Sequence, residues 1–435
     1  MTSSPLRQAA AAAFLLGVAC SDPTQPFPFQ SFSVSPALQW SGGVVTLRSS
    51  YFVGRSTLPT LLAGTDTLSA LRVDDSTLSV TLPRRPSGIV AISVAHDGRS
   101  DSVAAVQLAG LRATRVLSPG LQGELLVSDS GGHPFVLGNS DAPFAPYVPV
   151  GRIDLVTGSG VTLTSVLGPS SVQYGLAPST PAGAYAVRDS TDSVRLVVLL
   201  TSPPTVLRSV PFVGAGFVRH AVQLSAGLWL FTGSHTTTVR AEGDSCCLPR
   251  FSFQIESPWS VFLSPRGDRT ALVANVVGGG VPVFDNSTGD SAFTIPVVGT
   301  EGIVFSPDGS TLYAAGGFTN QPDTLFALDA TDGHAVAAKV RLPSGFVSFG
   351  LGYSTGGSGR ILVAAANPTT LALLVYNAHT LALEGVLETA DDCGAQPFTG
   401  PCFYGAVAVD DARLEAHIVI PGSPTPVWTF DLLSW

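Results

Sequence analysis

The stretch Ile303-Val304-Phe305-Ser306-Pro307-Asp308-Gly309-Ser310 joins an apolar run to a short polar turn, and a second apolar run follows it. Serine, aspartate and proline initiate tight turns, and glycine accepts the positive φ that such turns often need. The stretch Val261-Phe262-Leu263-Ser264-Pro265-Arg266-Gly267-Asp268 repeats the same order of residue types. Both stretches therefore predict two strands joined by a Ser-Pro-x-Gly turn.

The same phrase recurs in looser form along most of the chain. Its seven copies are spaced by 39 to 56 residues, with a mean of 47. A repeat of about 40 to 50 residues built only of strands is the sequence signature of propeller blades. We therefore predict an all-β fold with a seven-bladed β-propeller over residues 110–435. The residues that open the seven turns are Ser128, Ala177, Ser225, Ser264, Ser306, Ser354 and Asp410.

A second phrase, an Asx residue followed by threonine and often glycine, appears 21 to 26 residues after four of these turns. It has hairpin chemistry, because the Asx side chain caps the turn and glycine takes a positive φ. Each blade is therefore predicted to hold four strands, with this turn before the last one. The second and third copies lack the phrase. The four Asx residues are Asp154, Asp285, Asp329 and Asn377.

The end of the chain indicates how the ring closes. The last copy stops after a third strand, Val427-Trp428-Thr429-Phe430-Asp431, and only four residues follow. A fourth strand must come from elsewhere, and the run 112–117 before the first blade has no other role. We predict that it pairs there, leaves no open blade edge and buries Trp428 and Phe430. On this reading the propeller should fold without residues 1–109.

The composition fits an exported all-β protein and argues against some functions. Only 12% of the residues are charged, while 46 glycines and 33 prolines can punctuate many short strands. The net charge of −9 and the single lysine, Lys339, argue against a nucleic-acid partner, because phosphate binding needs clustered cations. A chain of 435 residues exceeds what one core usually holds, so two domains are expected.

Residues 32–109 are predicted to form a small separate sandwich. Apolar residues alternate with polar or small ones in the runs 45–48, 78–82 and 90–94, as half-buried strands require. Turn formers stand between these runs, in Ser41-Gly42-Gly43 and in the segment 83–88.

The order of these elements resembles the immunoglobulin-like IPT/TIG family. The matching segments are Val34-Ser35-Pro36, Ser41 to Leu47, Phe52, Gly64, Leu78 to Pro83 and Gly88. The resemblance implies a spacer or adhesion module without catalysis. The paired turn phrases of the propeller are similar to the YVTN and lactonase-like repeats of bacterial surface proteins.

Residues 1–20 are predicted to be a targeting segment. Arg7 precedes an apolar stretch of 11 residues, Ala9 to Ala19, which is too short to span a membrane. The end of this segment resembles a bacterial lipoprotein signal, in which the thiol of the cysteine, here Cys20, is lipidated. A proline-rich linker, 21–31, follows. The alternative is an ordinary cleaved signal that leaves Cys20 free or oxidised, and both readings predict export.

The remaining cysteines suit an oxidising compartment. Cys393 and Cys402 bracket a loop rich in glycine and proline and are predicted to form a disulfide. Cys246 and Cys247 are adjacent, so they could pair only as a strained vicinal disulfide. The usual close spacing of metal ligands is absent, and no metal or other cofactor is expected. The segment Asp329 to Gly333 has some features of a calcium loop, but it is better explained as a hairpin turn.

The loops that join strand two to strand three, and one blade to the next, lie on one face of a propeller. They are irregular here, whereas the turns on the opposite face are short and uniform. Loops of irregular length on a regular scaffold are common binding sites. We therefore expect partner contacts on this loop face, or else loops that only solvate the rim. The candidate contacts are Phe318, Asn320, Gln321, Asp392, Phe398 and Tyr404.

Three classes of function remain. The first is a monomeric lipoprotein of the bacterial cell envelope, on the outer membrane or cell surface, that binds a protein or glycan or serves as a scaffold. The second is a propeller enzyme such as a lactonase-like hydrolase, although no catalytic residues can be assigned from residue order. The third is a purely structural envelope component. Fold alone does not decide among these classes.

Overall fold

The computed structural model describes residues 32–433 with gaps, and in most strands between 115 and 260 it describes the backbone alone. The gaps are 97–98, 117–121, 129–133, 140–146, 155–159, 168–173, 177–183, 189–192, 199–204, 212–217, 226–227, 234–236, 242–250, 254–259, 274–279, 297–301, 317–322, 338, 344, 390–405 and 420–425. Within the described residues, no helical segment has the length and apolarity of a membrane span.

Two sheets pack face to face in the first part of the chain. One sheet has the order β1 (Ser33–Ser35), β3 (Val44–Arg48), β7 (Thr77–Thr81) and β6 (Ser69–Asp74). The other has the order β2 (Leu38–Trp40), β9 (Arg99–Ala109), β8 (Gly88–His96), β4 (Thr60–Ala63) and β5 (Asp66–Thr67). Their inward side chains, among them Leu47, Leu78, Ile92 and Val106, form one buried core. The alternation in the sequence therefore does produce a sandwich.

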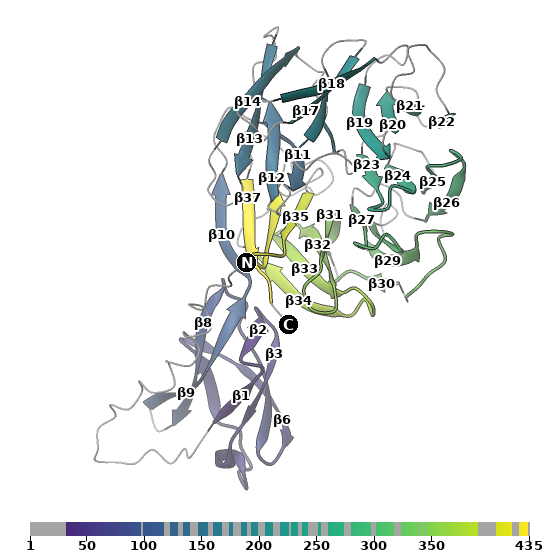
Figure 1. The fold of residues 1–435 in the computed structure, drawn as a ribbon. Coiled ribbons are helices and arrows are strands. Elements are labelled where there is room, and N and C mark those ends of the chain that lie inside the picture. The colour runs from purple at the N-terminus through teal and green to yellow at the C-terminus, as the bar shows by residue number, and fades with distance from the viewer. Residues whose placement is uncertain are drawn as a thin grey trace.

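The rest of the described chain forms seven four-stranded antiparallel sheets arranged as a ring (Figure 1). Inner strands of most neighbouring sheets contact each other, including those of the last and the first sheet. The first three blades are β11 (Gln122–Ser128), β12 (Pro134–Asn139), β13 (Tyr147–Asp154) and β14 (Gly160–Leu167); β15 (Tyr174–Leu176), β16 (Ala184–Arg188), β17 (Ser193–Val198) and β18 (Thr205–Pro211); and β19 (Val218–Ser225), β20 (Leu228–Gly233), β21 (Thr237–Ala241) and β22 (Phe251–Phe253).

The next three blades follow the same order of strands. They are β23 (Ser260–Leu263), β24 (Arg269–Val273), β25 (Val281–Asp285) and β26 (Ser291–Ile295); β27 (Gly302–Phe305), β28 (Thr311–Gly316), β29 (Thr324–Asp329) and β30 (Val340–Arg341); and β31 (Val347–Ser354), β32 (Arg360–Asn367), β33 (Thr370–Asn377) and β34 (Leu383–Glu388). The seven-bladed propeller predicted from the repeat spacing is confirmed.

The Ser-Pro-x-Gly turns form as their residue types require. In the fifth blade the backbone N–H of Gly309 donates to the Ser306 carbonyl at 2.8 Å, and Gly309 has a φ of 68°. The Ser306 hydroxyl donates to the Asp308 carboxylate at 2.6 Å. This bond, with those from Ser310, lowers the pKa of Asp308 to about 2. The opening residues of the last four turns, Ser264, Ser306, Ser354 and Asp410, are all buried.

The seventh blade confirms the predicted closure of the ring. It combines β35 (Ala406–Asp410), β36 (Glu415–Val419) and β37 (Pro426–Asp431) with β10 (Leu111–Val116) as its outer strand. β10 runs antiparallel to β37, with Thr114 opposite Trp428. Trp428 and Phe430 are buried in the core, as expected.

A charged cluster holds the closing strand in place. Arg112 of β10 donates to Glu415 of β36 at 2.8 Å and to Asp431 at 3.2 Å. Next to Glu415, His417 is fully buried, and its Nδ1 lies 3.0 Å from the Thr429 hydroxyl. Its Nε2 lies 3.8 Å from a Glu415 carboxylate oxygen, too far for a hydrogen bond. Burial lowers the pKa of His417 to about 4, against the opposing effect of Glu415 and Asp410.

The buried imidazole should make the propeller acid-sensitive. Because the pKa of His417 is about 4 in the folded protein and near 6.5 in the unfolded chain, the unfolded chain binds more protons between these values. The free energy of unfolding should therefore fall as the pH drops from 6.5 toward 4, by roughly 3 kcal/mol in total from this group.

Denaturant unfolding measured across this pH range checks the effect. The His417→Gln variant should be less stable at neutral pH and should lose that part of the pH dependence. The charged groups that face the imidazole, Glu415, Asp410, Arg112 and Arg413, are present in both proteins. An unchanged pH slope in the variant would contradict the assignment.

Candidate functional site

The predicted partner contacts all lie outside the described residues. Phe318, Asn320 and Gln321 fall in the gap before β29, and Asp392, Phe398 and Tyr404 fall in the gap after β34. The same holds for Cys20 and for the proposed disulfide pair, Cys393 and Cys402. The structure does describe the points at which these two loops join their blades, so it shows how the loop face is held.

Asp323 fixes the end of the first loop to the neighbouring blade. Its carboxylate accepts hydrogen bonds from the Ser348 backbone N–H at 2.6 Å and from the Ser348 hydroxyl at 2.7 Å. Ser348 lies near the start of the inner strand β31, so the bonds join the fifth blade to the sixth. Burial raises the pKa of Asp323, although the two hydrogen bonds from Ser348 act to lower it. Asp323, the first described residue after the gap 317–322, is therefore fixed to the neighbouring blade.

The opposite face carries the uniform turns predicted from the Asx phrase. Asn377 accepts hydrogen bonds from the backbone N–H groups of His379 and Thr380, each at 3.0 Å. Asp285 accepts one from Ser287 at 2.8 Å, and Gly289 takes a φ of 82°. Side chains of these residues are thus used to shape the turns.

The calcium-like segment is one of these turns. Ligand atoms of Asp329, Asp332 and His334 lie within 4.8 Å of one another. Asp329 accepts from the Thr331 N–H at 2.7 Å, and Asp332 pairs with the exposed His334 ring. Gly333 takes a φ of 77° and donates its N–H to the Asp329 carbonyl, which closes the hairpin. The hairpin accounts for the positions of all three side chains.

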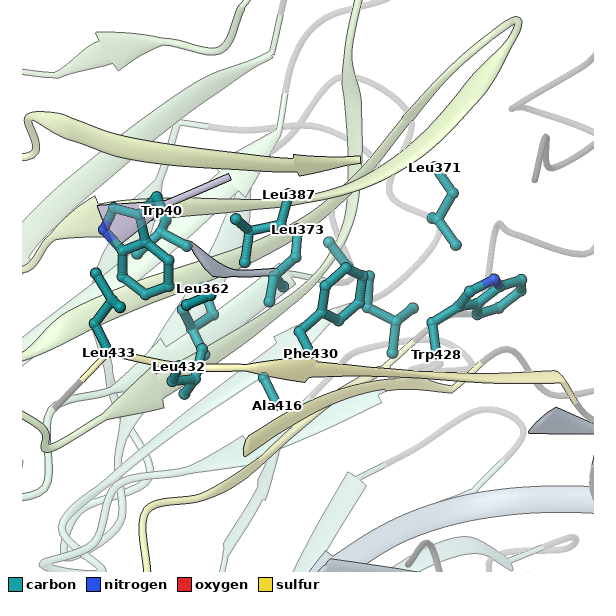
Figure 2. Close-up of a cluster of buried hydrophobic side chains, with 14 of the residues drawn as sticks. Trp40, Leu362, Leu371, Leu373, Leu387, Ala416, Trp428, Phe430, Leu432 and Leu433 are labelled. Carbon is teal, nitrogen blue, oxygen red and sulfur yellow. The ribbon is translucent and has the colours of Figure 1, made fainter. Parts of the chain in front are cut away.

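The best-defined contact between distant parts of the chain is the junction of sandwich and propeller. Trp40, at the end of β2, is only 2% exposed and belongs to the hydrophobic core between the sixth and seventh blades (Figure 2). Leu362 of β32 and Leu433 after β37 lie beside its indole ring. Gly385 of β34 faces the ring as well, and a Cβ there would stand 2.9 Å from the indole Cγ. The sandwich therefore inserts a side chain into the propeller core.

A buried arginine completes this contact. The Arg360 guanidinium lies over the Trp40 ring, 5.4 Å from its centroid. It donates to Glu384 at 3.0 Å and to the Leu433 carbonyl at 2.9 Å. A desolvated cation over an indole adds a favourable interaction, and the paired carboxylate offsets the cost of burying the charge. At the rim, Arg84 forms an ion pair with Glu388.

The covalent connection between the sandwich and the propeller is also short. A single residue, Gly110, separates β9 of the sandwich from β10 of the propeller. Its carbonyl accepts from the Asp431 N–H at 2.8 Å, and the Ser87 N–H donates to the Leu111 carbonyl at 2.9 Å. A Cβ at position 110 would stand 3.1 Å from the Ser41 Cβ. With no flexible linker and with bonds on both sides, the two parts are held in one orientation.

That the propeller folds without residues 1–109 stays a prediction, and the junction bears on its stability. Removing them would take Trp40 and Ala109 out of a core that also contains Trp428 and Phe430. The sequence analysis missed Trp40, Arg360 and Gly385. No local pattern could have identified them, because a tryptophan before a Ser-Gly-Gly turn carries no signal for a partner hundreds of residues away.

Comparison with known proteins adds the following. No family model matches the chain, and no curated protein matches it. Among solved structures, the chain is similar to the WD40 domain of coronin from Toxoplasma gondii, with 13% identity over 74% of this chain and 86% of that one and a TM-score of 0.49. It is also similar to the β-propeller domain of Cps50 (Swd1) from Myceliophteria thermophila, with 12% identity over 74% of this chain and 100% of that one and a TM-score of 0.49. Likeness at this level concerns the fold alone.

Replacing Trp40 by alanine should destabilise the protein strongly. The variant leaves a cavity between two blades and removes the cation–π partner of Arg360, so a loss of about 3 to 5 kcal/mol is expected. Thermal or denaturant unfolding measures it. Ile89→Ala is the matched control, because Ile89 is an exposed aliphatic residue of the same sandwich and should change stability little.

The Gly385→Ala variant tests whether the Trp40 ring packs against position 385. The added methyl group meets the Trp40 ring, so it should destabilise the parent protein. In the Trp40→Ala background the same change should be nearly neutral, because the space is empty. Equal effects in both backgrounds would show that the indole does not occupy this site in solution.

Proposed function

We propose that this protein is an exported, lipid-anchored module of the bacterial cell envelope that binds a protein or glycan partner, or serves as a scaffold for it, through its propeller. The proposed order of parts is a signal over 1–20, a tether over 21–31, an IPT/TIG-like spacer over 32–109 and a YVTN-like propeller over 110–435. The disulfide between Cys393 and Cys402 would stiffen one loop of the binding face.

The observation that supports this proposal best is the contrast between the two faces of the propeller. On one face the described turns are short, and their Asp, Asn and Ser side chains are bonded within the turns. On the other face Asp323, which follows the longer sequence segment 317–322, is bonded to the next blade. Irregular loops held by a rigid ring are suited to recognition. The fixed junction at Trp40 would present this face in a constant orientation.

The lipid anchor can be tested by metabolic labelling. If Cys20 carries acyl chains, labelled palmitate should be incorporated into the wild-type protein and not into the Cys20→Ser variant. The wild type should fractionate with membranes, because each buried CH₂ group contributes about 0.8 kcal/mol to anchoring. An unlabelled wild-type protein that stays soluble would contradict the anchor.

The binding face can be tested by photo-crosslinking in intact cells. A photoreactive residue at position 320 should give discrete adducts with a partner, and the same residue at Thr288, exposed in an Asx turn of the opposite face, should give none. Substituting Asn320 and Phe398 should remove the partner without lowering the melting temperature. Adducts that form only from position 288 would show that the partner binds the turn face.

A further inference from the structure

The strand register shows at which end of the sandwich the chain enters. Ser33, the first strand residue, pairs with Arg48, and Arg48 pairs with Thr77. At the other end, Val44 pairs with Thr81, next to the Ser41 and Pro83 region that adjoins the propeller. The sandwich extends away from the ring (Figure 1). The N-terminal segment is therefore attached at the end farthest from the propeller, here called the tip.

Two segments of the tip expose aliphatic side chains. The segment 53–58 after the short helix η2 (Ser50–Phe52) exposes Val53 at 55% and Leu58 at 38%. Strand β6 exposes Val73 near the tip at 64%, and it exposes Leu71, which pairs with the middle of β7, at 71%. Three of these side chains, Val53, Leu58 and Val73, lie at or near the tip, and Leu71 lies farther toward the propeller.

The tip is built as a defined surface. Arg72 of β6 donates to the Phe52 carbonyl at 3.2 Å and to the Arg55 carbonyl at 2.9 Å, which ties the two segments together. Arg55 lies over the Tyr51 ring at 3.8 Å and donates to the Tyr51 carbonyl. The inward-pointing Arg72 also discourages another strand from pairing with the edge of β6. The exposed aliphatic side chains can therefore contact another surface, whereas the edge of β6 does not favour pairing with an added strand.

We propose that the tip of the sandwich, with Val53, Leu58 and Val73, lies in the interface of the lipid bilayer. This rests on the proposed anchor at Cys20. From Cys20 to Phe32 an extended chain spans at most about 40 Å, so the anchor confines the tip near the membrane. Such confinement raises its effective concentration at the surface, and aliphatic contacts too weak to bind alone then suffice. The contact at the tip would fix the orientation of the sandwich relative to the membrane. Because the Trp40 junction holds the propeller to the sandwich, it would fix the orientation of the propeller as well.

The test uses the chain from residue 20 with Cys20→Ser, which keeps every described residue and has no lipid. Sedimentation with vesicles of phosphatidylethanolamine and phosphatidylglycerol should show weak binding at high lipid concentration. Val53→Asp combined with Val73→Asp should reduce the partition coefficient at least about tenfold, because carboxylates enter the interface poorly. Ile89→Asp is the matched control, since Ile89 is 69% exposed at the propeller end and should leave binding unchanged.

The outcomes distinguish this inference from the proposed function. Palmitate labelling of the wild type together with no vesicle binding of the unlipidated chain would leave the anchor in place and overturn the tip contact. Loss of binding in Ile89→Asp as large as in the tip variant would also overturn it. Light scattering that shows a dimer abolished by the tip substitutions would assign the surface to a second copy instead. Equal melting temperatures of all variants show that the substitutions act at the surface.

Discussion

The pairing of β10 with β37 is the constraint on which the rest of the structure depends. It joins residues 111–116 to residues 426–431, so the last blade is completed by the segment that precedes the first one. Arg112 secures the pair through Glu415 and Asp431. Because Gly110 is the only residue between β9 and β10, the strand that closes the ring also positions the sandwich. The strand pairing that closes the propeller ring therefore also fixes the orientation of the sandwich.

The core that receives Trp40 takes residues from both the sixth and the seventh blade. Leu362 and Leu433 belong to it, and Gly385 leaves room for the indole. Arg360 brings a positive charge into this apolar region, where Glu384 and a carbonyl group satisfy it. A buried charge with a fixed set of partners adds less to stability than to the choice of one arrangement. The junction thus favours a single relation between sandwich and propeller.

Local chemistry made much of the fold predictable from the sequence. Ser306, Asp308 and Gly309 close a turn by contacts among themselves, so their order alone identifies it. The closure of the ring was predictable because too few residues follow the third strand of the last blade to form a fourth. The second and third blades form four strands although they lack the Asx phrase, so the phrase is not required for a fourth strand. The place of Trp40 was not predictable, because its neighbours belong to distant strands that come together only in the folded ring.

The burial of Trp40 also sets the order in which the protein can mature. The sandwich is synthesised first, yet the core that covers its tryptophan is complete only when residue 433 has been made. At about 5 to 20 residues per second, the chain beyond β10 takes roughly 20 to 60 s to synthesise. The native junction therefore cannot form until the strands of the sixth and seventh blades are both present.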